Sequence, residues 1–104
     1  MHKIKVLIKE VGKKPRCVNI SCSLKNLQKT VGGDIETVTI AEDFVVICNE
    51  EGRLLGLPHN CNIVGVDFVG TIILRGIDGD DFGDIPVPYA DIKRIMPNLW
   101  EVKK

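Results

Sequence analysis

Polar side chains able to bind a ligand gather in residues 49 to 65, NEEGRLLGLPHNCNIVG. Amide, guanidinium and imidazole groups of this kind recognise polar and phosphate-bearing ligands, and loops held by a sheet are where they collect. A further basic side chain, at the end of the apolar run 72–74, could complete a pocket. Asparagines that only cap turns through their own backbone are the competing interpretation. The predicted ligand-binding residues are Asn49, Arg53, His59, Asn60 and Arg75.

Catalytic chemistry has weaker support in the same stretch. A cysteine nucleophile needs a neighbouring general base, and His59 and Cys61 form such a pair only if the loop turns sharply. No evident third member lies nearby, and Gly32 and Gly33 are not followed by the Lys-Ser or Lys-Thr of a phosphate-binding loop. We therefore predict that the protein is not an enzyme, with an enzyme built on Cys61 and His59 as the alternative.

The four cysteines have spacings unlike those of the common zinc modules. Four residues separate Cys17 from Cys22 and twelve separate Cys48 from Cys61, without a C-x2-C pair. Cys17 and Cys48 lie in apolar runs and are predicted to be buried thiols. We predict no metal and no cofactor, and zinc held by Cys22, Cys61 and His59 is the alternative.

Composition limits the class of protein. The chain has 104 residues, of which 44% are hydrophobic and 27% charged, the balance of one globular domain over residues 1–104. Fourteen basic and fourteen acidic side chains leave a formal net charge of zero, so no overall field attracts nucleic acid or an anionic membrane. No signal-peptide run or bilayer-length apolar segment is present. We expect a cytoplasmic protein without sequence-specific nucleic acid or membrane partners.

Hydrophobic periodicity predicts an α+β fold. It is a small antiparallel sheet of about five strands, with one short helix packed on it and a C-terminal helix. We expect residues 77–84 to form an exposed turn. The predicted strands cover residues 3–9, 16–21, 34–40, 44–49, 53–56 and 69–76, with Val18 and Ile20 turned to the core.

Both predicted helices have recognisable ends. Ser23 can cap the first helix, Leu24, Leu27 and Val31 form its apolar stripe, and Gly32 can close it.

In the C-terminal helix, Pro88 suits the first turn and Pro97 is expected to end the helix. Its predicted apolar stripe consists of Ile92, Ile95 and Met96.

Three segments, VGGDIETV, CNEEGRLLGLPHN and GTIILRGIDGDDF, resemble a family known as domain of unknown function 3846. The resemblance implies small proteins that are frequent in bacteriophages and mobile elements of low-GC Gram-positive bacteria. The family-like region covers residues 3–83, and residues 84–104 look individual to this chain.

Leu57, Pro58 and Asn60 match the Leu-Pro-x-Asn pattern of that family. The resemblance therefore makes Gly56 and Asn60 candidate turn-defining or ligand-binding positions. Cys61 departs from the family pattern, because a basic residue often follows the asparagine there. The resemblance therefore does not imply that residue 61 contacts a phosphate.

The resemblance implies a setting more than a mechanism. A phage setting favours small non-enzymatic proteins that bind a host component, including sponges for cyclic-nucleotide or ADP-ribose-derived messengers. We expect an accessory protein in the cytoplasm of the bacterial host that binds a small polar, nucleotide-derived ligand and counters antiviral defence. Arg53, Asn60 and Arg75 are expected to converge on that ligand.

A protein–protein module is the alternative function. Such a module would inhibit or recruit a host protein through a sheet edge or through the Tyr89–Trp100 region. Small antiparallel sheets expose edges, and pairing two edges in a symmetric dimer is a common remedy. We therefore expect a homo-oligomer.

Overall fold

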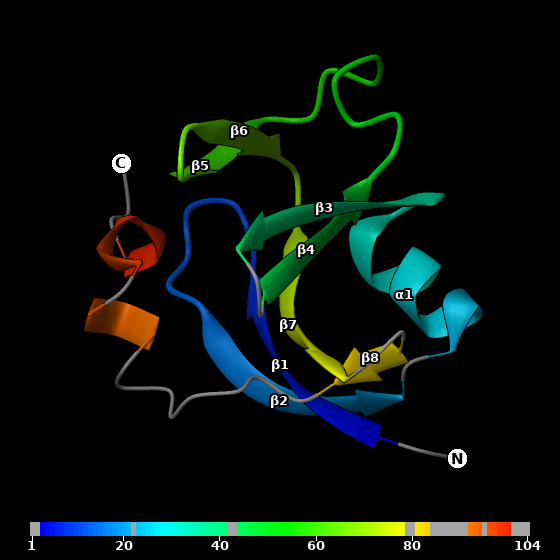
Figure 1. Cartoon of the computed structure of the whole chain (residues 1–104). Coiled ribbons are helices and arrows are strands. Elements are labelled where there is room, and N and C mark those ends of the chain that lie inside the picture. The colour runs from blue at the N-terminus through cyan, green and yellow to red at the C-terminus, as the bar shows by residue number, and fades with distance from the viewer. Residues whose placement is uncertain are drawn as a thin grey trace.

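The computed structural model describes residues 3–21, 23–41, 44–78, 81–83, 92–94 and 96–100. The main sheet is antiparallel, with the strand order β2-β1-β7-β4-β3 and the short β8 paired to β7, while β5 and β6 form a second, two-stranded sheet (Figure 1). These elements confirm the predicted α+β class. Their bounds are β1 Lys3–Lys9, β2 Arg16–Ser21, α1 Leu24–Val31, β3 Ile35–Ala41, β4 Phe44–Asn49, β5 His59–Ile63, β6 Val66–Val69, β7 Ile72–Asp78, β8 Asp81–Gly83 and the 3-10 helix η1 Pro97–Trp100.

The main sheet has a hydrophobic cluster on each face. Figure 1 shows α1 and the C-terminal segment on opposite sides of the sheet, so each face has its own cover. The cluster beneath α1 contains Ile4, Val6, Ile8, Leu27, Val31, Ile47 and Ile73. The cluster beneath the β5–β6 hairpin and the C-terminal segment contains Leu7, Phe44, Val46, Cys48, Cys61, Ile63, Phe68, Ile72, Leu74, Ile92, Met96 and Leu99.

Helix α1 has the predicted ends. The Ser23 hydroxyl accepts a hydrogen bond from the Asn26 backbone N–H at 3.3 Å, and Gly32 closes the helix with a φ of 82°. Leu27 and Val31 are buried as predicted, but the prediction for Leu24 is wrong, because that side chain is 58% exposed. Leu24 and Lys25 at the start of the helix are exposed, whereas Leu27 packs in the core and the Val31 carbonyl accepts a hydrogen bond from Asn49 of β4.

The strand predicted at residues 53–56 is wrong, because that segment is a series of turns. The Leu55 N–H donates to the Glu51 carbonyl and the Gly56 N–H to the Arg53 carbonyl, which curls the chain. Gly56 has a φ of 69°, a conformation that favours glycine. The hairpin of β5 and β6, which the sequence analysis did not predict, follows these turns.

Two local predictions on the sheet are also corrected. Residues 77–84 are not simply an exposed turn, because β7 continues to Asp78 and pairs with β8. Cys17 is exposed rather than buried. Val18 and Ile20 lie opposite Val6 and Ile4 on the α1 face, as predicted, and strand alternation therefore turns Cys17 to the other face.

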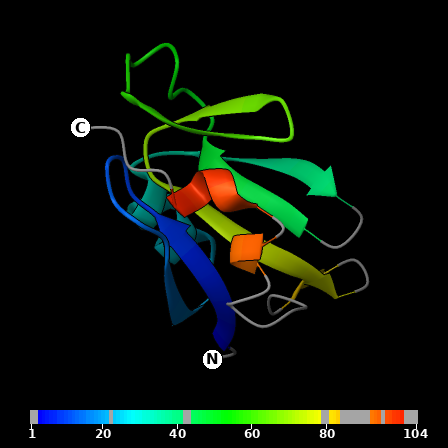
Figure 2. The same ribbon diagram turned by 90° about the vertical axis from the view of Figure 1, so that its left-hand side faces the viewer.

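The C-terminal segment crosses the second face of the sheet (Figure 2). Residues 92–94 are helical, and Ile92 and Met96 are buried as predicted. The described helical residues 92–94 lie before Pro97, which begins the separate 3-10 helix η1, since its fixed φ suits the first turn of a helix. The expected helix start at Pro88 and the side chain of Ile95 lie outside the described residues. No helix in the described part of the chain has the length and apolar character needed to span a bilayer.

Candidate functional site

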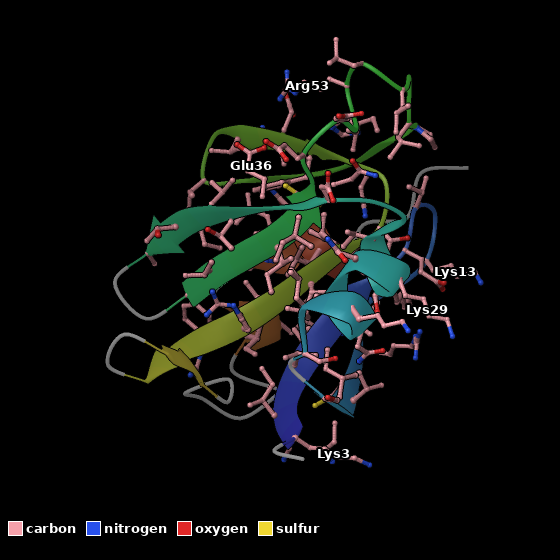
Figure 3. All side chains as sticks on the ribbon, turned by 90° about the vertical axis from the view of Figure 1, so that its right-hand side faces the viewer. Lys3, Lys13, Lys29, Glu36 and Arg53 are labelled. Atoms are coloured by element: carbon pink, nitrogen blue, oxygen red, sulfur yellow. The ribbon has the colours of Figure 1, made fainter. Side chains whose placement is uncertain are left out.

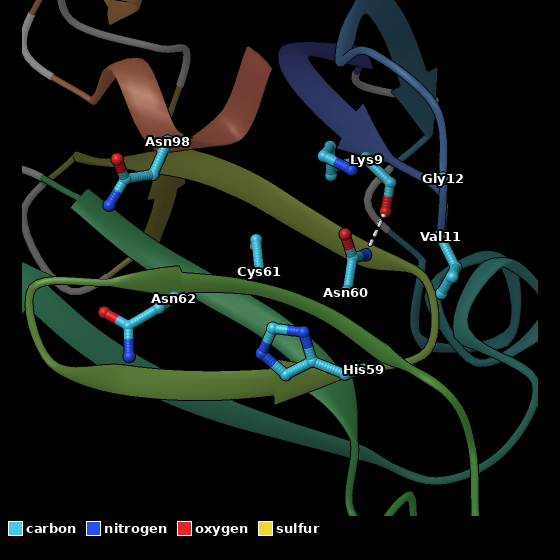
Figure 4. A pocket seen from close by; sticks show the side chains of 8 residues that line it. All are labelled: Lys9, Val11, Gly12, His59, Asn60, Cys61, Asn62 and Asn98. Atoms are coloured by element: carbon cyan, nitrogen blue, oxygen red, sulfur yellow. Dashed lines mark hydrogen bonds between the residues drawn. The ribbon is translucent and has the colours of Figure 1, made fainter. Parts of the chain in front are cut away.

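A cavity of about 160 Å³ lies where the end of β1, the strand β5 and the helix η1 meet (Figure 4). Three distant parts of the sequence therefore contribute to one hollow. Most of its side chains are polar, although it adjoins the hydrophobic cluster that contains Cys61. Its lining residues are Lys9, Val11, Gly12, His59, Asn60, Cys61, Asn62 and Asn98.

An irregularity in β5 aims Asn60 into this cavity. His59 lies opposite Val69 and Cys61 lies opposite Phe68, so Asn60 is an extra residue in its strand. Such β-bulges redirect side chains and are over-represented beside functional sites. The Asn60 amide donates to the Lys9 carbonyl at 2.8 Å and to the Gly70 carbonyl at 2.7 Å. This clamp ties the hairpin to β1.

The Asn60 side-chain oxygen is the unusual feature of the clamp. It is buried and accepts no hydrogen bond in the described structure. A buried acceptor without a partner is costly, and a ligand or water that donates to it removes that cost. Because Asn60 lines the cavity, this unsatisfied acceptor lies beside it.

Lys9 supplies the charge of the cavity. Only 2% of the residue is exposed, and its Nζ donates to the neighbouring Glu10 carbonyl at 3.1 Å. No carboxylate of the described residues forms an ion pair with it. Burial lowers the pKa of Lys9, because the charged form loses its hydration. A buried cation of this kind attracts an anionic group.

Sequence reasoning missed Lys9, although a signal was present. In KVLIK the lysine directly follows Leu7 and Ile8, at the end of a strand apolar on both faces. Its partner in β7 is the fully buried Ile72, on the same face. A lysine that continues an apolar run in this way is placed where only its tip can reach a polar space.

Cys61 contacts the same cavity but lacks the properties of a nucleophile. It is 5% exposed, and burial raises its pKa to about 11, with Lys9 only partly offsetting that effect. The thiolate is the reactive form, and reactive cysteines need a lowered pKa and access. Burial therefore keeps Cys61 in the thiol form at neutral pH.

His59 lies at the rim of the cavity and faces Asp67 on the outer side of the hairpin. The Asp67 carboxylate is 3.3 Å from the His59 Nε2 and accepts from the Asn62 amide at 2.9 Å. These hydrogen bonds, the Asn62 bond foremost, lower the pKa of Asp67. The Asp67 carbonyl accepts from the Arg53 guanidinium at 2.9 Å. This network fixes the orientation of His59.

Comparison with known proteins identifies the family. The family model "Domain of unknown function (DUF3846)" matches residues 4–96, which is most of the chain. The chain belongs to the DUF3846 family. No curated protein and no solved structure matches it.

Two of the five predicted site residues of this DUF3846 chain line the cavity, and both lie at the start of β5. His59 and Asn60 line it, but Arg53 lies in a different groove with Glu36 and Leu54. Arg75 is buried in β7, where its guanidinium donates to the Gly76 carbonyl at 3.0 Å. The expected convergence of Arg53, Asn60 and Arg75 is therefore wrong, because the turns after β4 hold Arg53 at another groove and Arg75 is buried within β7.

Asn49 has a structural position instead. Its amide donates to the Val31 carbonyl at the end of α1, and its side-chain oxygen accepts from the Glu51 N–H at 2.8 Å. It is 7% exposed. The polar atoms that were expected to meet a ligand are thus directed to the backbone of this DUF3846 chain.

The residues suggested for zinc are only partly described. His59 and Cys61 both line the cavity, while Cys22 lies outside the described residues. Among the residues that the structure describes, no three His, Cys, Asp or Glu side chains group as metal ligands would. The described part of the DUF3846 chain therefore gives no geometry on which to build a metal centre.

Proposed function

We propose that this protein is a non-enzymatic binder of a small polar ligand whose anionic group enters the cavity beside Lys9. The supporting observation is the Lys9 ammonium, buried without a carboxylate partner among the described residues. An anion supplies the missing counter-charge, and a hydroxyl or N–H of the same ligand donates to the Asn60 oxygen. A phosphate that retains a proton carries both features.

The size of the cavity defines which part of a ligand it holds. Its volume of about 160 Å³ is smaller than the roughly 300–1,000 Å³ of pockets that enclose drug-sized ligands. The cavity thus suits a phosphate or carboxylate group rather than a whole nucleotide. In our proposal the remainder of a nucleotide-derived ligand lies outside, along the rim near His59 and Asn62.

The wider role that we propose is the capture of a nucleotide-derived messenger of antiviral defence. This step rests on the phage and mobile-element setting that the family resemblance implies. The docking alternative at Tyr89–Trp100 has less support, because Trp100 is partly buried against the hydrophobic cluster and Tyr89 lies outside the described residues.

Replacement of Lys9 by methionine tests the proposal. We expect wild-type protein to bind inorganic phosphate in a calorimetric titration at pH 7, and Lys9→Met to bind at least tenfold more weakly. A charge-assisted hydrogen bond of about 1.5–3 kcal/mol accounts for that loss. Without phosphate, the variant should be more stable by about 1 kcal/mol, because an uncompensated buried charge is removed.

The exposed Lys5 on the same strand provides the matched control. Lys5→Met should leave phosphate binding unchanged. Absence of phosphate binding by the wild-type protein, or equal binding by Lys9→Met, would contradict the proposed site. If phosphate binds but no nucleotide in a panel of mononucleotides and cyclic dinucleotides binds more tightly, only the messenger role fails.

A further inference from the structure

The two edge strands of the main sheet differ in how well they are protected against pairing with another chain. β2 forms one edge, with Pro15 immediately before it and an exposed Arg16 at its start. β3 forms the other edge and pairs only with β4 among the described strands. Proline and basic side chains protect an edge from pairing with another chain. β3, with the sequence IETVTIA, has no proline and no basic side chain, and its only such devices are Glu36 and a register shift between Thr39 and Ala41.

The surface beside β3 leaves apolar groups uncovered. A groove of about 220 Å³ separates Glu36 and Val38 of β3 from Val66 and Phe68 of β6. The 51–56 turns border the groove, and Leu54 there is 90% exposed. Figure 3 shows Glu36 and Arg53 on the same side of the molecule, at the two borders of this groove. Burial of a leucine exposed to this degree by a partner lowers the free energy of the complex.

The sequence of β3 permits antiparallel pairing with a second copy of itself without placing like charges opposite one another. When two copies pair antiparallel about Val38, Thr37 lies opposite Thr39 of the second copy, and Glu36 lies opposite Ile40. Cross-strand threonine pairs stabilise sheets, and this register opposes no like charges. The formal net charge of zero also means that no overall repulsion keeps two copies apart.

We propose that β3 pairs with β3 of a second copy of this chain, so that two five-stranded arrays become one continuous sheet. The pairing supplies backbone hydrogen bonds to the open edge and brings the second copy over the exposed leucine border. Symmetry makes the contact isologous, and it therefore closes as a dimer. The cavity beside Lys9 is formed within one chain, so this interface is independent of the ligand site.

Introduction of charge at Thr37 and Thr39 tests the pairing, because both side chains are exposed and neither belongs to the core. Native mass spectrometry and light scattering should show a dimer for the wild-type chain. Thr37→Lys/Thr39→Lys and Thr37→Glu/Thr39→Glu should each be monomers, since like charges then face one another. A mixture of the two variants should form a heterodimer with one copy of each.

Asn19→Glu on the opposite edge is the matched control and should remain dimeric. Circular dichroism establishes that each variant is folded before its mass is interpreted. The proposal is overturned if the wild-type chain is still monomeric when its concentration is raised 100-fold above the minimum needed for the mass measurement. It is also overturned if the lysine or glutamate variant remains dimeric, or if their mixture gives no heterodimer. A monomeric Asn19→Glu protein would place the contact at β2 and would also overturn it.

Discussion

Val64 occupies a backbone conformation that its side chain resists. It shares the two-residue loop between β5 and β6 with Gly65, and both residues have positive φ, 44° and 87°. Positive φ at both positions is the pattern of a type I′ turn, which prefers Asn-Gly. A β-branched residue is strained there, and Val64 is also 70% exposed, so packing does not explain its presence.

Val64→Asn should therefore stabilise the protein. We expect the free energy of unfolding to rise by about 1 kcal/mol, because the strain at this position is relieved. Urea denaturation measures the change. Val64→Thr is the control, since it makes the side chain more polar but keeps the β-branch. Equal gains in the two variants would show that exposure of the valine, rather than its φ, limits stability.

At the scale of elements, the side chains of two asparagines between residues 49 and 60 join neighbouring elements through hydrogen bonds. Asn49 joins the end of α1 to the turn after β4, and Asn60 joins β5 to β1. The packing around Asn49 is close, because a Cβ built on Gly33 would come within 2.9 Å of its Nδ2. Both side chains are thus engaged by the backbone of neighbouring elements.

Asn49→Ala should weaken the connection between α1 and β4 without affecting ligand binding. We expect a loss of about 2 kcal/mol in the free energy of unfolding, because the Val31 carbonyl and the Glu51 N–H lose their partner. Urea denaturation measures the stability, and calorimetry at a temperature where the variant is folded measures phosphate binding. Asn19→Ala, at an exposed position, is the control. Weaker phosphate binding by folded Asn49→Ala would show that Asn49 contributes to the ligand site.

The elements that were predicted correctly are those whose formation depends on residues close together in the sequence. The cap at Ser23, the glycine at Gly32 and the apolar run 44–49 act through near neighbours, so their consequences are readable from the chain. The β5–β6 hairpin was missed because its turn is Val-Gly instead of Asn-Gly. The cavity was only half predicted because Lys9 and Asn60 are far apart in sequence and meet through the sheet.

At the scale of the whole molecule, the two faces of the sheet differ in what packs against them. The Cα radius of gyration is 12.7 Å, close to the roughly 13 Å of a compact domain of about 100 residues. The α1 face is an ordinary apolar contact between helix and sheet. The other face adjoins the cavity, where a buried amine and a buried thiol lie close enough to influence each other's pKa. Stability in alkaline solution therefore depends on that face.

These two groups change stability with pH in opposite directions. The pKa of Lys9 is lower in the folded state than its usual 10.5, so its contribution makes the fold more stable as pH rises towards 10.5. The pKa of Cys61 is raised from 9.0 to about 11, so its stabilising contribution is complete below pH 9 and is lost as pH rises towards 11. The shift of Cys61 corresponds to about 2–3 kcal/mol at most.

Removing each group in turn separates the two effects. We expect the stability of Cys61→Ala, measured by urea denaturation from pH 8 to 11, to fall less with pH than that of the wild-type protein. Lys9→Met should fall more steeply, because the opposing contribution is gone. Other groups that titrate in this range, Cys48 included, are common to all three proteins and cancel in the comparison. Parallel pH profiles would mean that neither group is buried in solution, and the cavity would then lose the charge on which phosphate binding depends.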